Sequence, residues 1–168
     1  MNSELEAYFV SARTAGVESR EDTQVLQRKR VDLPARFLDK ADSLLKPVMD
    51  STAETLRRHG YGATVELVRD QSGSDPNTFP YITLHFSADR CAPSDLGYIY
   101  TLAGASITFI CRRNDLCVEV VAAHPAGRGH ERRVNSSTLD LDVLTYDRVN
   151  GIVTDLSLIH ISEPTRPY

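Results

Sequence analysis

The sequence predicts an α+β fold, with N-terminal helices and a C-terminal helix packed on a mostly antiparallel, four- to five-stranded meander sheet. Apolar residues recur at helical spacing up to Gly60, and after Gly62 their period changes from about 3.6 residues to about 2. Helical spacing returns near Thr145. Because the helical and strand patterns occupy separate stretches of the chain, helices should pack on a sheet of sequential antiparallel strands.

Residues 1–31 are predicted to form a short helix followed by a polar linker. Ser3 and Glu6 have the spacing of a capping box, and apolar residues follow at helical intervals as far as Gly16. The stretch after Gly16 is polar and contains the basic run 28–30. Because acidic residues accompany this run, we interpret it as a solvated linker rather than a nucleic-acid patch.

The main helix is predicted to begin near Asp32 and Pro34 and to end at Gly60. Glycine suits the left-handed residue that follows a helix, and three basic residues before it complement the helix dipole. Pro47 lies inside this helix, where it removes one backbone hydrogen bond at a cost of about 3 kcal/mol. The apolar pattern continues through Pro47, so we expect a kink and not two unrelated helices.

Strands are predicted at residues 63–69, 80–88, 106–112 and 116–123, from alternating apolar and polar residues. In the second of these, Ile82, Leu84 and Phe86 should face the core. The composition of residues 70–79 indicates a loop, whereas residues 90–105 fit either a strand or a loop that covers the core. Residues 130–137 are polar and fit an edge strand at best.

Two cysteines flank a tight turn in the sequence CRRNDLC, which raises the question of a disulfide or a metal clip. If Asn114 and Asp115 form a two-residue hairpin loop, Cys111 lies opposite Val118, and the apolar residues of both strands share one face. A register that pairs Cys111 with Cys117 would place Glu119 on that apolar face. We therefore predict that the two cysteines point to opposite faces, with no disulfide and no metal site.

The C-terminal sequence LSLIHISEPTR, residues 156–166, matches without interruption the translation of a transposon-end adapter used in DNA library preparation. We therefore expect residues 156–168 to be a non-native tail and the native chain to be known only to about Asp155, with its own end missing. Residues 1–155 then form a single domain, divided into the helix and linker (1–31) and a main body (32–155). A tail that was never selected to pack should add nothing to stability.

The composition favours a cytoplasmic protein. The formal net charge is −4, which disfavours nucleic acid and anionic membranes as partners, and the N-terminus has no apolar run of signal-peptide type. The three cysteines should then be reduced. His85, His124 and His130 lack any accompanying catalytic motif, so the sequence assigns no catalytic residue, metal ligand or cofactor.

The most informative surface is the second face of the sheet, which is too apolar for a solvated face and too polar for a core. The binding residues predicted on this face are Tyr81, Thr83, His85, Ile110, Glu119 and Val121. The preferred hypothesis is a binding or accessory domain that contacts a protein partner or a second copy of itself. The alternative is an enzyme or small-ligand binder with its pocket on this face, where Glu119 would be the carboxylate placed to tune His85.

A third hypothesis is RNA binding through a basic patch. Its candidate residues are Arg112, Arg113, Arg128, Arg132 and Arg133. Nearby acidic residues offset their charge, and no aromatic residues are interleaved for base stacking, so the sequence gives this hypothesis the least support.

Overall fold

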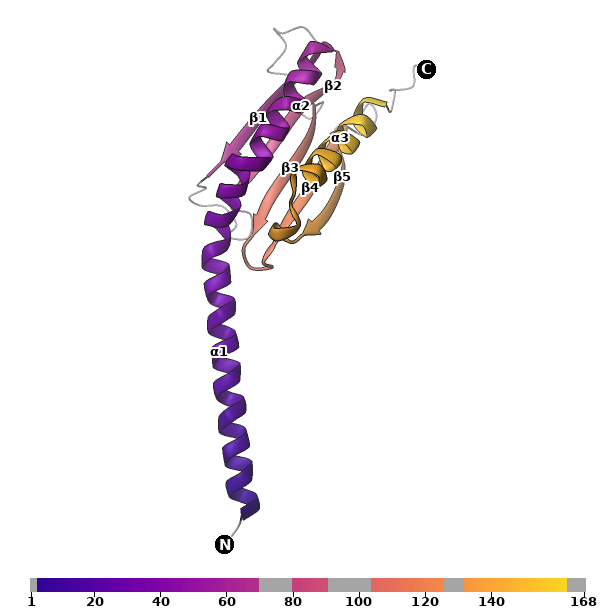
Figure 1. The fold of residues 1–168 in the computed structure, drawn as a ribbon. Coiled ribbons are helices and arrows are strands. Elements are labelled where there is room, and N and C mark those ends of the chain that lie inside the picture. Colours follow the sequence, from indigo (N-terminus) through magenta and orange to yellow (C-terminus); the bar gives the residue numbers. More distant parts are fainter. Residues whose placement is uncertain (1–2, 70–79, 91–103, 126–131, 163–168) are drawn as a thin grey trace.

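The α+β fold is confirmed: helices pack on a five-stranded antiparallel sheet (Figure 1). The computed structural model describes residues 3–69, 80–90, 104–125 and 132–162; the predictions for residues 70–79 and 91–103 lie outside this part of the chain. The elements are α1 (Ser3–Lys40), the π-helical segment η1 (Ala41–Leu45), α2 (Lys46–Arg58), β1 (Tyr61–Val68), β2 (Tyr81–Arg90), β3 (Gly104–Arg112), β4 (Cys117–Pro125), β5 (Arg132–Leu139), the 3-10 turn η3 (Leu141–Val143) and α3 (Tyr146–Ser162).

The strands follow one another across the sheet in the order β1-β2-β3-β4-β5, as expected of a meander. The predicted register of the β3–β4 hairpin is confirmed, since Cys111 lies opposite Val118. The paired strands end one residue pair earlier than expected, at Arg112 and Cys117. Both Cys111 and Cys117 are free cysteines.

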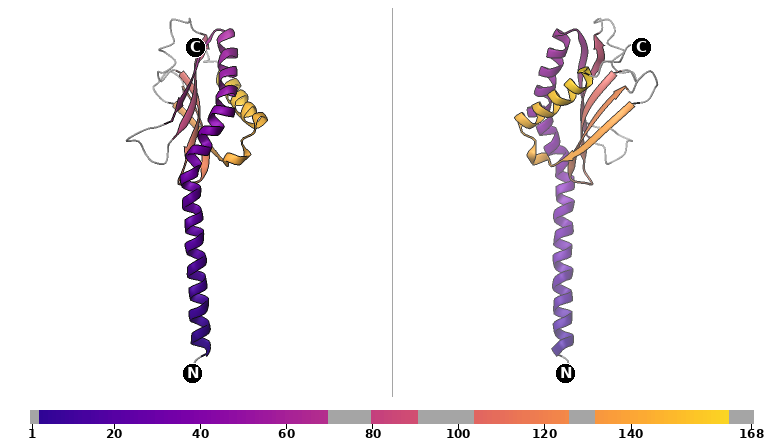
Figure 2. Two further views of the ribbon diagram at one scale, coloured as in Figure 1. Left: turned by 60° about the vertical axis from the view of Figure 1, so that its left-hand side comes forward. Right: turned by 90° about the vertical axis from the view of Figure 1, so that its right-hand side faces the viewer.

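Helices α2 and α3 cover the same face of the sheet, as the two turned views show (Figure 2). The core lies between them and the sheet. Its members include Val48, Met49, Ala53 and Leu56 from α2, Ile82, Leu84, Phe86, Ile107 and Phe109 from β2 and β3, and Val149 and Val153 from α3. The predicted inward residues of β2 are thus confirmed, with Ile82, Leu84 and Phe86 all 0% exposed.

Helix α1 corrects two predictions about the N-terminal region. It runs without a break from Ser3 to Lys40, so the linker predicted after Gly16 and the helix start predicted near Asp32 and Pro34 are both wrong. The segment between Gly16 and Asp32 lacks proline and glycine and is rich in Glu, Gln, Arg and Lys, which are strong helix formers. The polar composition of this segment indicates that no face of it is buried, but a polar segment can still be helical.

Pro47 is accommodated by a change of helix type just before it. The turn Ala41–Leu45 is π-helical, and the backbone N–H of Lys46 donates to the carbonyl of Ala41 instead of the usual position four residues back. Widening the helix in this way relieves the clash between a proline ring and the preceding turn. Helix α2 continues beyond it at an incline to α1, consistent with the expected kink (Figure 1).

The end of α2 follows the predicted stop signal. Gly60 has a φ of 86°, the left-handed conformation that glycine adopts without a steric penalty, and its N–H donates to the carbonyl of Arg57. The chain then enters β1 directly at Tyr61.

The adapter-like residues do not lie apart from the domain. Helix α3 continues through them to Ser162, Leu156 packs against the core, and Ser157 is 4% exposed. The hydroxyl of Ser157 donates to the carbonyl of Val153 one turn earlier. Leu156 continues the apolar stripe of Val149 and Val153, and this packing argues against the expectation that the segment adds nothing to stability. None of the described helices has a stretch both long and apolar enough to cross a membrane.

Candidate binding surface on the open face of the sheet

The six predicted binding residues lie together on the sheet face opposite α2 and α3, here called the His85 face. Register places Tyr81, Ile110 and Glu119 in one row across β2, β3 and β4. The next row is Thr83, Thr108 and Val121, and His85 lies in the row beyond, opposite Ser106. Thr83 is 3% exposed, and the other five predicted residues are half-buried.

A hollow of about 300 Å³ lies at the centre of the His85 face. It is lined by Glu66, Tyr81, Thr83, His85, Ser106, Thr108 and Ile110. The hydroxyls of Thr83 and Thr108 are 3.0 Å apart and share a hydrogen bond. The hollow therefore combines hydroxyl groups with an aromatic ring, an isoleucine and one charged pair. Glu119 and Val121 lie on the same face but outside the lining.

The charged pair joins two strands. The Nε2 atom of His85 is 3.5 Å from the Oε2 atom of Glu66, which follows from the register that places Glu66 opposite Thr83 on β1 and β2. The side chain of His85 is 22% exposed and that of Glu66 is 49% exposed. The imidazole is thus largely enclosed, while the carboxylate stands at the rim of the hollow.

Glu119 is not the carboxylate beside His85, so that element of the enzyme hypothesis is corrected. Strand β3 separates β2 from β4, and Glu119 shares a row with Tyr81, four residues along β2 from His85. At about 3.3 Å per residue, this offset alone is about 13 Å along the strand. Glu119 instead accepts hydrogen bonds from the guanidinium of Arg112.

Three residues that line the hollow, Glu66, Ser106 and Thr108, are not among the six predicted binding residues. Glu66 alternates with the inward residues Val65 and Leu67 of β1, a signal that assigns it to the outer face. Alternation cannot tell which residue of β2 it approaches, because this depends on the β1–β2 register across a twelve-residue connection. Ser106 lies directly opposite His85, and placing it there required the register between β2 and β3.

Glu66, His85 and Ser106 bring a carboxylate, an imidazole and a hydroxyl onto three adjacent strands. Acyl transfer also needs N–H donors aimed at the developing oxyanion. In the described strands, the backbone N–H groups beneath the hollow belong to interior ladders of the sheet, since both β2 and β3 are paired on each side. These strands therefore supply surface chemistry suited to binding, but no oxyanion hole.

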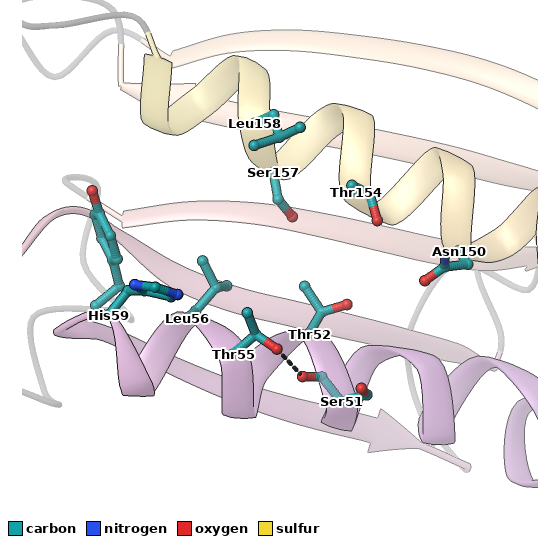
Figure 3. Close-up of a pocket in the computed structure, with 10 residues that line it drawn as sticks. Ser51, Thr52, Thr55, Leu56, His59, Asn150, Thr154, Ser157 and Leu158 are labelled. Carbon is teal, nitrogen blue, oxygen red and sulfur yellow. Dashed lines mark hydrogen bonds between the residues drawn. The ribbon is translucent and has the colours of Figure 1, made fainter.

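A larger groove of about 480 Å³ lies between α2 and α3 on the opposite side of the domain (Figure 3). Hydroxyl groups of Ser51, Thr52 and Thr55 line one wall. The other wall includes Ser157 and Leu158, which belong to the adapter-like tail predicted from the sequence. Because a non-native tail would form that wall, the smaller hollow on the His85 face is the better candidate despite its size.

The two cysteines in the described ranges, Cys111 and Cys117, do not contribute a reactive group to either cavity. Cys111 is 0% exposed, and burial raises its pKa to about 12. Cys117 is half-buried, and its pKa is also raised, first by burial and then by the carboxylates of Asp115 and Glu119. Both thiols therefore stay protonated at neutral pH, the unreactive state. No cluster of three or more histidine, cysteine or acidic residues suited to a metal ion occurs within the described ranges.

The basic patch of the RNA hypothesis is divided between the two ends of β4, since Arg112 lies opposite Cys117 whereas Arg132 and Arg133 lie opposite Pro125 and His124. Arg112 is engaged by Glu119, and Arg128 lies outside the described ranges. A guanidinium neutralised by an adjacent carboxylate has less charge to offer a phosphate.

The chain was compared with known proteins at three levels. No family model, curated protein or solved structure matches it. The candidate surface therefore has to be interpreted from its own chemistry.

Proposed function

We propose that this protein is a cytoplasmic binding module that takes up a segment of a partner protein on its His85 face. The observation that carries the proposal is the hollow, which combines a half-buried histidine, a threonine pair and apolar side chains at the centre of a sheet face that no described helix covers. Protein interfaces have this mixture, with apolar groups and aromatic rings among a limited number of hydrogen-bonding groups.

The partner segment should offer both apolar and hydrogen-bonding contacts. Tyr81 and Ile110 supply apolar area, whereas the hydroxyl groups and His85 can exchange hydrogen bonds with polar side chains or with backbone groups. Glu66 adds a negative charge at the rim. A hydrogen-bond donor or cation in the partner would complement that charge best.

A photocrosslinking amino acid introduced at Ile110 tests this proposal in cells. We expect a discrete adduct with one partner protein, because a buried contact holds the probe against one surface. The matched control is the same probe at Val134, which lies on β5 on the same sheet face, is 60% exposed and lies outside the hollow. Equal adduct patterns from both positions would refute a specific surface, and an adduct of twice the chain mass would identify the partner as a second copy.

A second candidate function is hydrolysis or acyl transfer, and it is favoured by the adjacency of Glu66, His85 and Ser106. A fluorophosphonate probe that labels Ser106 in the native chain, but not in His85→Ala, would support this function over binding. We expect no labelling, because β2 and β3, which carry His85 and Ser106, are paired on both sides, so the sheet engages the N–H groups that could stabilise an oxyanion there.

A further inference from the structure

Helix α1 projects from the body as a single rod, as both figures of the fold show (Figures 1 and 2). Residues 20–29 are all exposed, and Leu33, at 4% exposure, is buried where the helix meets the body. Isolated helices are marginal in water, because in proteins most helical stability comes from packing against a partner. A projecting helix of this length therefore points to a partner helix.

One face of the projecting segment carries exposed valines. Val10, Val25 and Val31 are 66%, 48% and 63% exposed. At about 100° per residue, these three positions fall within a sector of about 120° around the helix, and Glu6 and Arg28 fall in the same sector. The sector that leads to buried Leu33 and Phe37 lies on the other side of the helix. The valine face is thus exposed and points away from the sector by which α1 enters the body.

The charges of the segment favour an antiparallel partner with the same sequence. Glu6 lies near its start, whereas Arg28, Lys29 and Arg30 lie just before it meets the body. A parallel pair of copies would bring the two basic clusters together, and like charges repel. An antiparallel pair centred near residue 17 places Glu6 opposite Arg28 and brings Val10 beside Val25.

The length of the segment fits the same arrangement. When the antiparallel pair is centred near residue 17, the start of each helix lies beside about residue 32 of the other copy. Leu33, the next residue, is buried in the body. The whole projecting segment can therefore pair before the two bodies meet.

We propose that α1 pairs with α1 of a second copy of this chain in an antiparallel two-helix arrangement, so that the protein is a dimer joined by its projecting helices. The proposal does not rest on the function proposed for the His85 face. The dimer would place the two His85 faces at opposite ends of one rigid particle.

Charge exchange at the predicted contact tests the dimer in the full chain. By size-exclusion chromatography with light scattering, we expect a mass twice the 18.7 kDa of the chain. Glu6→Lys and Arg28→Glu should each weaken dimerisation roughly tenfold, because each introduces repulsion at both symmetric contacts. The double variant should restore it, since the opposite charges meet again. Arg57→Glu, an exposed change on α2, is the matched control and should leave the dimer intact.

Disulfide trapping tests the orientation. A mixture of Val10→Cys and Val25→Cys chains should form the mixed disulfide, whereas Val25→Cys alone should not form a disulfide with itself. Rapid self-coupling of Val25→Cys would show a parallel pair and overturn the proposal. A monomeric wild-type chain would overturn it as well, and so would a dimer that Ile110→Glu disrupts while Arg28→Glu leaves it intact.

Discussion

Truncating Leu84 tests the assignment of the two faces of β2. Leu84 is 0% exposed and lies between Val65 and Ile107 on the neighbouring strands. Leu84→Ala removes roughly three carbon groups at about 0.8 kcal/mol each, which is about 2.4 kcal/mol before any cavity term. The cavity left in a strand with neighbours on both sides brings the expected loss to about 3–5 kcal/mol.

His85→Ala is the matched control, one residue further along the same strand. Its side chain lies on the outer face and pairs with a half-exposed carboxylate, so its removal should cost about 1 kcal/mol or less. Chemical denaturation followed by circular dichroism measures both free energies of unfolding. For a domain of this size, the Leu84 variant should also melt roughly 6–20 °C lower. Equal losses in the two variants would refute the assignment of the strand faces.

Three further predictions concern other parts of the molecule. Because burial raises the pKa of Cys111 from 9.0 to about 12, mass spectrometry should find Cys111 alkylated more slowly than Cys117. The buried, protonated thiol contributes stability that is fully present below pH 9 and should be lost as the pH rises toward 12. Ending the chain before Leu156 should lower stability by about 1–2 kcal/mol, since a partly buried leucine is removed; an unchanged midpoint in urea would contradict its packing. Glu66→Gln should change the NMR chemical shifts of the His85 ring, because the Glu66 carboxylate lies 3.5 Å from its Nε2 atom, whereas unchanged shifts would show that the two side chains do not interact.

The candidate surface could be predicted only in part from the sequence. Alternation in β2 and β3 is a local property, so it assigned Tyr81, Thr83, His85 and Ile110 to the outer face without knowledge of the partner strands. The partner of His85 could not be found in this way. Its identity depends on how β1 aligns with β2, and nothing local sets that alignment.

The N-terminal helix and the C-terminal tail both differ from what their local sequence predicted. Residues 17–31 are helical because their intrinsic propensity is high and Gly16 costs only about 1 kcal/mol within a helix, although residues 20–31 bury little. Leu156 lies in a segment that matches an adapter, yet it packs on the core because its position continues the phase of α3. Whether a segment is expected to be native therefore does not determine whether its side chains are buried.

The sequence by itself determined the class of fold, the inward residues of the strands and the cysteine register, because each follows from a periodicity that only one pairing satisfies. In the hairpin, placing Cys111 opposite Val118 was the register that kept Glu119 off the apolar face. The tertiary structure decided which polar groups meet on the outer face and where α1 leaves the body. Polar contacts such as that between His85 and Glu66 depend on strand register and strand order. The hydrophobic pattern specifies which residues enter the core, but it does not specify which polar residues meet on the outer face.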